Sequence, residues 1–162
     1  MSNKVIFLDI DGVIQSPRYC VSTQQTGVMC AFEPAAMNFL RIILENTGAK
    51  IVISSTWRIG DYETSRNELK MIFCACGYSE IAEAFHTDWR TENLNAIRGT
   101  EIKEWLDRHK NIKEYLILDD DNDMLPEQKD RFVKTDPMNG FLLQHFDDAL
   151  MVFGIDSSKL GL

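Results

Sequence analysis

Three short apolar segments, each followed at once by polar residues, constrain the fold of this chain more than any other feature. They span residues 4–8, 50–54 and 114–118, and residues 132–135 form a shorter segment of the same kind. Continuous apolar runs of this length are typical of strands that are covered on both faces. The pattern therefore predicts buried strands in a sheet with helices packed against both sides.

Segments with helical periodicity alternate with the expected strands. Pro34 suits the first turn of a helix, where its missing N–H costs little, and Gly48 is well placed to end that helix. Ser65 and Glu68 have the spacing of a capping box, and Thr100 is expected to cap a further helix. The expected apolar faces are Met37, Leu40, Ile43 and Leu44; Leu69, Ile72 and Phe73; Ile102, Trp105, Leu106 and His109; and Leu143, Phe146, Leu150 and Phe153.

The alternation of strands and helices predicts the fold class. Because right-handed crossovers connect parallel strands, we expect a three-layer, Rossmann-like α/β fold with a mainly parallel sheet and helices on both faces. Ligands bind such sheets outside the carboxyl ends of the strands. Three of the expected strands end in Asp9 and Asp11, in the tract 54–56, and in Asp119 and Asp120. The sequence therefore predicts that these side chains meet at one edge of the sheet.

Length and charge restrict the class of protein. A chain of 162 residues without repeats or a Pro/Gly/Ser-rich linker is expected to form one domain over residues 1–162. The formal net charge of -8 argues against broad electrostatic attraction to a nucleic-acid backbone. No apolar run approaches the roughly 20 residues that span a bilayer, and the N-terminal segment lacks the features of a signal peptide. We therefore expect a cytoplasmic protein that has no membrane partner.

The four cysteines, Cys20, Cys30, Cys74 and Cys76, are few for the length and are expected to be free thiols. Cys74 and Cys76 lie two residues apart at the end of an expected helix, where they point to different faces. No second Cys/His pair has the spacing of a zinc site, so structural thiols are the preferred interpretation.

The pair Asp9 and Asp11, followed by Gly12, carries the strongest chemical signal. Carboxylates can accept a phosphoryl group, and Asp9 at the strand end can present one for in-line attack on phosphorus. Asp11 then lies near the oxygen that needs a proton as it leaves. Two anions repel a phosphate, and a hard divalent cation such as Mg²⁺ relieves this repulsion. With Asp119 and Asp120 completing the shell of that ion, the pattern predicts a Mg²⁺-dependent phosphatase.

Each of these features also has a purely structural explanation. An acidic pair after a strand is common in turns, a hydroxyl tract is common in caps, and acidic runs are usually solvated. The joint occurrence of the acidic pair, the hydroxyl tract and the acidic run at three strand ends favours a phosphatase site over these structural explanations. Asp119, Asp121 and Asp123 imitate the start of an EF-hand loop, but Met124 and Asp130 occupy positions that need Gly and Glu.

Several segments resemble the motifs of the haloacid dehalogenase-like (HAD) superfamily. Residues 7–13 match its first motif, a strand followed by D-x-D-G. Residues 51–54 look like its second motif, a strand ending in Ser or Thr, and residues 117–120 resemble its acidic fourth motif. The resemblance covers nearly the whole chain. More narrowly, residues 54–58, 98–102, 117–121 and 135–137 are similar to the HAD modules of Swiss-army-knife RNA-repair proteins.

The resemblance implies a role for each matched residue. Asp9 would be the nucleophile that forms an aspartyl-phosphate, and Asp11 would protonate the leaving group and then activate water. Ser54 would hydrogen-bond the transferring phosphoryl group. An aspartate at the second position of the first motif favours a phosphatase over a dehalogenase. The implied Mg²⁺ ligands are the Asp9 side chain, the Asp11 backbone carbonyl and Asp120, with Asp119 assisting and Asp123 as a ligand or a neighbour of one.

Two assignments have alternatives in the sequence. The cation of the third motif is Arg98, just before an expected helix, with Lys103 one turn inside that helix as the alternative. Ser55 competes with Ser54 for the phosphate, because a shift of one residue turns the other side chain inward. Both choices depend on which side chain faces the strand ends.

Substrate contacts are expected from the residues that follow the second motif. Ser55, Thr56 and Arg58 are the candidates, and a guanidinium suits phosphate through bidentate contacts. Trp57 could stack on a base or pack beneath the loop.

The gaps between motifs leave little room for a cap domain. Beyond a helix and a strand, the gap between Asp11 and Ser54 holds about 20 residues, and residues 58–97 hold a helix and irregular chain. A minimal cap and an open site suit a phosphate on a nucleotide or at a polynucleotide end, and a partner protein could supply the missing cap. The alternative function is a non-catalytic phosphate- or nucleic-acid-binding module, or a receiver-like signalling module.

Overall fold

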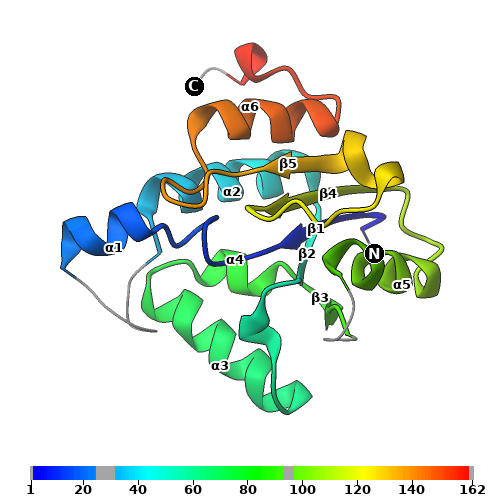
Figure 1. Ribbon diagram of the computed structural model, residues 1–162, viewed down its shortest axis with the longest axis horizontal. Coiled ribbons are helices and arrows are strands. Elements are labelled where there is room, and N and C mark those ends of the chain that lie inside the picture. The colour runs from blue at the N-terminus through cyan, green and yellow to red at the C-terminus, as the bar shows by residue number, and fades with distance from the viewer. Residues whose placement is uncertain (1, 25–31, 93–96, 161–162) are drawn as a thin grey trace.

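A five-stranded sheet forms the centre of the computed structural model, which describes residues 2–24, 32–92 and 97–160. The strand order is β3-β2-β1-β4-β5, and every neighbouring pair is parallel (Figure 1). This confirms the expected α/β fold class. The strands are β1 (Lys4–Leu8), β2 (Lys50–Ile53), β3 (Phe85–Arg90), β4 (Glu114–Asp119) and β5 (Phe132–Lys134).

Helices fill the connections between the strands. None of the helices within the described residues has the length and apolar character of a membrane span. The α-helices are α1 (Pro17–Thr23), α2 (Pro34–Thr47), α3 (Tyr62–Ala75), α4 (Ser79–Glu83), α5 (Arg98–Arg108) and α6 (Leu143–Val152), and the short 3-10 helices are η2 (Thr56–Arg58), η3 (Pro126–Arg131) and η4 (Ser157–Lys159).

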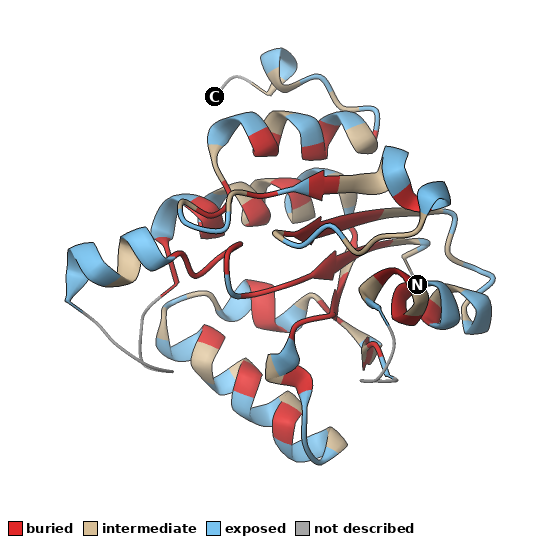
Figure 2. Ribbon diagram, viewed as in Figure 1, coloured by how far each residue is buried: buried red, intermediate tan, exposed pale blue. Residues whose placement is uncertain are grey.

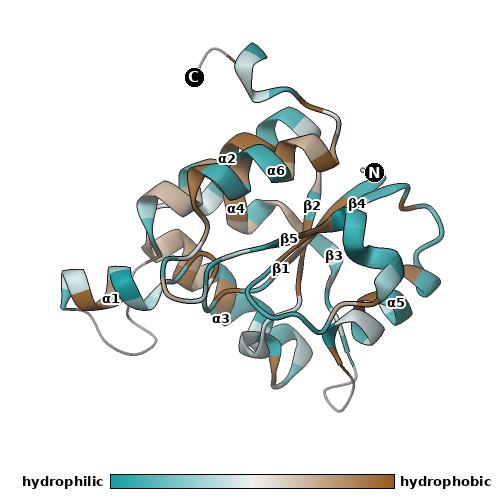
Figure 3. Ribbon diagram, turned by 45° about the horizontal axis from the view of Figure 1, so that its top comes forward, coloured by the Kyte–Doolittle hydropathy of each residue, from teal (hydrophilic) through white to brown (hydrophobic). Residues whose placement is uncertain are grey.

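The strands point their side chains alternately into two cores, which explains why the runs are apolar throughout. On β1, Ile6 and Leu8 join the larger core with α2, α3, α4 and α6, whereas Val5 and Phe7 join the smaller core with α5. Trp105 of α5 packs edge-to-face on Phe7, with ring centroids 5.3 Å apart. The buried strands and their hydrophobic centre are visible in Figures 2 and 3. Each large side chain buried there contributes roughly 1.5–3 kcal/mol, which holds both helix layers on the sheet.

Helix α3 begins earlier than its sequence pattern predicts. Asp61 is the N-cap and accepts a hydrogen bond from the Thr64 N–H at 2.9 Å. Ser65, the expected cap, lies inside the helix and donates its hydroxyl to the Ile59 carbonyl. The capping-box prediction at Ser65 is therefore wrong, because Asp61 offers an acceptor one turn earlier.

Helix α5 also begins earlier, at Arg98 rather than after Thr100. Its first N–H groups are satisfied from a distant segment. The Arg98 N–H donates to the Asp123 carboxylate at 2.9 Å, and the Gly99 N–H donates to the Asp123 carbonyl at 3.2 Å. The acidic loop after β4 thus caps the helix, and rules based on nearby sequence do not detect such a cap.

The edge strand β3 and the helices α1 and α4 are absent from the sequence predictions. β3 has the sequence Phe-His-Thr-Asp-Trp-Arg, and only Phe85 and Trp89 of these side chains are buried. Because an edge strand with two buried side chains carries a weak apolar signal, residues 58–97 looked irregular. Between β1 and α2 the described residues hold α1 as their only helix, so the cap on this side is small, as expected.

The cysteines differ from the expectation in one respect. Cys20 is disulfide-bonded, so the prediction of a free thiol is wrong at that position. Cys74 and Cys76 are free thiols, as expected. Cys30 lies outside the described residues.

Candidate active site

The carboxyl ends of β1 and β4 bring three aspartates together. The strands are neighbours, and the Asp9 N–H donates to the Leu118 carbonyl at 3.0 Å. One carboxylate oxygen from each of Asp9, Asp119 and Asp120 lies within 4.8 Å of the others. Asp9 and Asp119 are buried, with exposed fractions of 7% and 1%. The side chains of the first and fourth motifs therefore meet at one edge of the sheet.

Burial makes negative charge costly in this acidic cluster, which comprises Asp9, Asp119 and Asp120. Burial, together with the charge of Asp9, raises the pKa of Asp119 to about 7. Burial also raises the pKa of Asp9, although Arg98 and the Ser55 hydroxyl oppose the shift. The pKa of Asp120 is raised as well, mainly by burial. A positive charge among these groups would favour their ionised forms.

The donor set of the acidic cluster fits a hard divalent cation. All of its donors are carboxylate oxygens, which are ligands that Mg²⁺ prefers in proteins. Oδ2 of Asp119 is buried and has no hydrogen-bond partner among the described residues. A metal ion would give this oxygen a coordination bond and offset the cost of burying the carboxylates.

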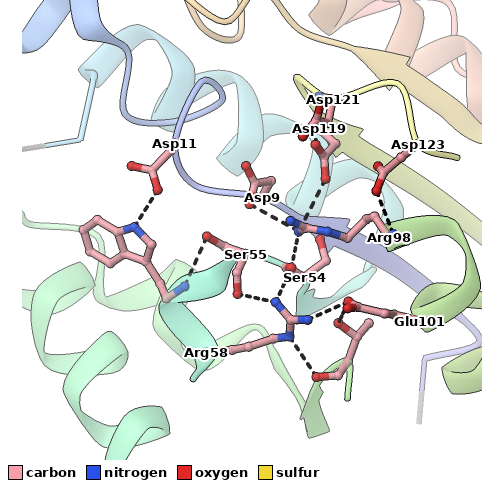
Figure 4. A network of polar contacts seen from close by, with 12 residues as sticks. Asp9, Asp11, Ser54, Ser55, Arg58, Arg98, Glu101, Asp119, Asp121 and Asp123 are labelled. Atoms are coloured by element: carbon pink, nitrogen blue, oxygen red, sulfur yellow. Dashed lines mark hydrogen bonds and ion pairs between the residues drawn. The ribbon is translucent and has the colours of Figure 1, made fainter. Parts of the chain in front are cut away.

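Arg98, the first residue of α5, reaches into the acidic cluster. Its Nη1 lies 3.3 Å from Oδ1 of Asp9 and 3.5 Å from Oδ2 of Asp119, and it also donates to the Ser54 carbonyl (Figure 4). Burial lowers the pKa of Arg98, but the two carboxylates outweigh it and the pKa is raised. Lys103 points elsewhere and pairs with Asp107 at 2.6 Å on the surface. Of the two candidate cations, the structure places Arg98 at the strand ends.

The two serines of the second motif face different surroundings. Oγ of Ser54 is buried and has no hydrogen-bond partner among the described residues. The Ser55 side chain lies close enough to the Asp9 carboxylate to lower the pKa of Asp9. Thr56 is exposed at the start of η2. The geometry therefore favours Ser55 over Ser54 as the hydroxyl beside Asp9.

Arg58 lies beneath the site rather than at its mouth. The residue is 2% exposed, and its guanidinium donates to the carbonyls of Ser54 at 2.6 Å, Ser55 at 2.7 Å and Thr91 at 2.9 Å. Nη2 also donates to Oε2 of Glu101 at 2.5 Å. This placement differs from the expected substrate contact, because the guanidinium is enclosed and engaged by protein groups. Arg58 instead fixes the backbone of the second motif.

Asp11 is exposed and its carboxylate lies outside the acidic cluster. Oδ2 accepts a hydrogen bond from Nε1 of Trp57 at 2.8 Å. In Figure 4 the carboxylate points away from Asp9 and towards the indole ring. The side chains of Asp9 and Asp11 thus diverge from one strand end.

Gly12 holds the first and fourth motifs in close contact. Its φ is +69°, and a Cβ at this position would lie 2.4 Å from Oδ2 of Asp120. The Gly12 carbonyl also accepts from Oγ1 of Thr135 at 2.7 Å. The glycine therefore allows the turn after Asp11 and leaves room for the Asp120 carboxylate.

Two residues that hold the site together were missed from the sequence. Glu101 pairs with Arg58, and Oγ1 of Thr91 donates to the same Glu101 oxygen at 3.3 Å. Glu101 is 4% exposed, and it lies three residues after Arg98 on α5. The spacing of three residues places Glu101 near Arg98 on α5, but no signal in the sequence indicates the contact of Glu101 with Arg58 or Thr91.

The parallel sheet and the aspartates at the ends of β1 and β4 define a HAD-like domain, a class of hydrolases and phosphatases in general. The chain belongs to the family described as HAD domain in Swiss Army Knife RNA repair proteins, whose sequence model matches residues 5–146. No curated protein and no solved structure matches the chain significantly.

Proposed function

We propose that this protein is a Mg²⁺-dependent phosphatase that hydrolyses phosphate monoesters through an aspartyl-phosphate on Asp9. The observation that carries the proposal is the acidic cluster with the Arg98 guanidinium 3.3 Å from Asp9. A carboxylate nucleophile, a hard-cation donor set and a fixed positive charge are the groups that phosphoryl transfer needs.

The side chains of Asp9 and Asp120 and the backbone carbonyl of Asp11 would hold Mg²⁺, with Asp119 assisting. The bound ion would neutralise charge on the phosphoryl oxygens and orient the phosphate. The raised pKa values of Asp9, Asp119 and Asp120 support this assignment, because each carboxylate becomes easier to ionise beside a cation.

In the first step, an oxygen of Asp9 attacks phosphorus as the bond from phosphorus to the leaving oxygen breaks. Asp11 gives a proton to that oxygen. Arg98 offsets negative charge on Asp9 and on the equatorial oxygens of the phosphoryl group, and the Ser55 or Ser54 hydroxyl donates to one of these oxygens.

In the second step, Asp11 takes a proton from water, and the water oxygen attacks phosphorus. The bond between phosphorus and the Asp9 oxygen breaks, which releases inorganic phosphate and restores the carboxylate. Asp11 thus acts as the acid in the first step and as the base in the second, because the attacking water takes the position of the oxygen that left.

The proposed substrate is a phosphate at a polynucleotide end, or a nucleotide. The family description names RNA-repair proteins, and the small segment between β1 and α2 supports an open site. The net charge of -8 gives the chain little unaided affinity for a polyanion, so a partner protein that presents the substrate or caps the site belongs to the proposal.

The test compares phosphate release from end-phosphorylated oligonucleotides, nucleotides and sugar phosphates, with Mg²⁺ and with EDTA. We expect turnover that EDTA abolishes and that Asp9→Asn lowers by at least about 10³-fold, since the nucleophile is lost. Equal rates on all substrates would reject the polynucleotide assignment alone. Mg²⁺-dependent binding of phosphate without turnover would instead support the binding or receiver-like alternative.

A further inference from the structure

Trp57 connects the second motif to Asp11, the residue to which the proposed function gives proton transfer. Nε1 of Trp57 donates to Oδ2 of Asp11 at 2.8 Å, although the two residues are 46 positions apart. We propose that Trp57 is a positioning residue that orients the Asp11 carboxyl group towards the leaving group. This role rests on the proposed phosphatase function.

The chemistry of the indole determines which Asp11 oxygen carries the proton. An indole N–H donates a hydrogen bond and cannot accept one. Oδ2 therefore presents a lone pair to Trp57 whether Asp11 is ionised or protonated, and the transferable proton lies on Oδ1. Oδ1 gives this proton to the leaving oxygen as the P–O bond breaks, and it takes one from water in the second step. Trp57 keeps its own proton throughout.

Packing holds the indole in place. The Trp57 backbone N–H donates to Oγ of Ser55 at 3.4 Å. The indole ring of Trp57 lies against the Phe32 ring, with centroids 6.4 Å apart. Phe32 is 1% exposed and packs on Phe73 with centroids 4.6 Å apart. The Trp57 indole, which donates to Asp11, is thus packed against the hydrophobic core through Phe32.

Asp11 needs such a partner because its side chain is exposed. An exposed aspartate samples several rotamers, and only some of them face a given leaving oxygen. The bond to Trp57 selects one direction and keeps the Asp11 carboxylate outside the acidic cluster of Asp9, Asp119 and Asp120. The carboxylate therefore remains available for proton transfer.

The kinetic test compares phenyl phosphate with 4-nitrophenyl phosphate, which differ mainly in how strongly the leaving oxygen needs a proton. We expect Trp57→Phe to lower kcat/KM, which reports the chemistry up to formation of the aspartyl-phosphate, by about 10- to 100-fold for phenyl phosphate and by less than about threefold for 4-nitrophenyl phosphate. Asp11→Asn should show the same selectivity to a greater degree. Ile59→Ala, at an exposed neighbour of η2, should leave both rates unchanged.

A second measurement tests the hydrogen bond without any substrate. The protein has three tryptophans, and Nε1 of Trp89 and of Trp105 has no hydrogen-bond partner among the described residues. We expect the Trp57 indole proton to resonate downfield of the other two in a ¹H–¹⁵N spectrum. Asp11→Ala should move this resonance alone upfield.

The outcomes separate the positioning role from the enzyme itself. An equal loss of kcat/KM on both esters, or no loss, would overturn the role of Trp57 while leaving the phosphatase in place. A gain of activity in Trp57→Phe would show that the indole restrains Asp11 in an unproductive position. If the wild-type protein with Mg²⁺ releases phosphate neither from these esters nor from the oligonucleotides and nucleotides, the proposed function fails and the positioning role fails with it.

Discussion

Nη2 of Arg58 lies 2.5 Å from Oε2 of Glu101, and their side chains are only 3% and 5% exposed. This buried pair joins the second motif to the helix that begins with Arg98. The Ser54 carbonyl accepts hydrogen bonds from both Arg58 and Arg98, so one backbone oxygen connects the two arginines. The position of the candidate catalytic cation thus depends on contacts beneath the site.

The first prediction concerns this buried pair. Removing one partner leaves an unpaired buried charge, so Glu101→Ala is expected to lower the free energy of unfolding by about 3–5 kcal/mol, measured by urea denaturation. Asp107→Ala is the control on the same helix, because it breaks the exposed Lys103–Asp107 pair, and it should leave stability unchanged within error. Equal effects of the two variants would contradict the supporting role of Glu101.

The second prediction concerns Gly12, which has a matched control in Gly154. Their φ values are +69° and +70°, but a Cβ on Gly154 meets no atom within 4 Å. Gly154→Ala should therefore cost only the left-handed strain of roughly 1–2 kcal/mol. Gly12→Ala adds the collision with Asp120, so it should cost more and should also weaken Mg²⁺ binding, as measured by calorimetric titration. Mg²⁺ affinity that is equal in the two variants would contradict the proposed ligand role of Asp120.

The third prediction concerns stabilisation by the metal. Because Mg²⁺ would bind the folded acidic cluster, it should raise the thermal unfolding midpoint, with about 2.7 kcal/mol gained at 100 times its Kd. Asp120→Asn should remove most of this gain. Asp121→Asn removes the same charge from an exposed neighbour in the loop and should retain the gain. A loss of the gain in both variants would indicate a general charge effect rather than a defined site.

The sequence predicted the centre of the site because that centre follows strand ends. β1, β2 and β4 are buried on both faces, so their apolar runs locate the points where Asp9, Ser54 and Asp119 emerge. Parallel pairing then brings these points to one edge without any knowledge of side-chain contacts. The fold class and the acidic cluster were accessible for this reason.

The remaining features depend on contacts between distant segments. Arg58 matched a phosphate-binding arginine in the sequence, but its burial against Glu101 is set by how η2 packs on α5. The same holds for the cap of α5 by Asp123 and for the direction of Asp11, which is fixed by Trp57. Local periodicity contains no information on these pairings, so only the three-dimensional arrangement distinguishes a substrate contact from a supporting one.

The last prediction concerns His145, which lies away from the acidic cluster in the first turn of α6. Nδ1 of His145 accepts a hydrogen bond from the Leu142 N–H at 3.1 Å, so the ring must be neutral at this nitrogen. The side chain is largely buried, and burial lowers its pKa below 6.5, although Asp148 and Asp136 oppose the shift. Protonation would remove the acceptor and place a charge in a buried position.

The sign of the pH dependence follows from this lowered pKa. Below about pH 6.5 the unfolded chain binds a proton that the folded chain does not, so folding is progressively disfavoured as the pH falls through the folded pKa. His145→Gln keeps an acceptor for the Leu142 N–H at the same helical position but does not titrate. We therefore expect the free energy of unfolding of the wild-type protein to fall relative to that of His145→Gln between pH 7.5 and pH 5, in urea titrations at matched ionic strength. A constant difference between the two proteins across this range would show that His145 gains its proton as readily in the folded state as in the unfolded one.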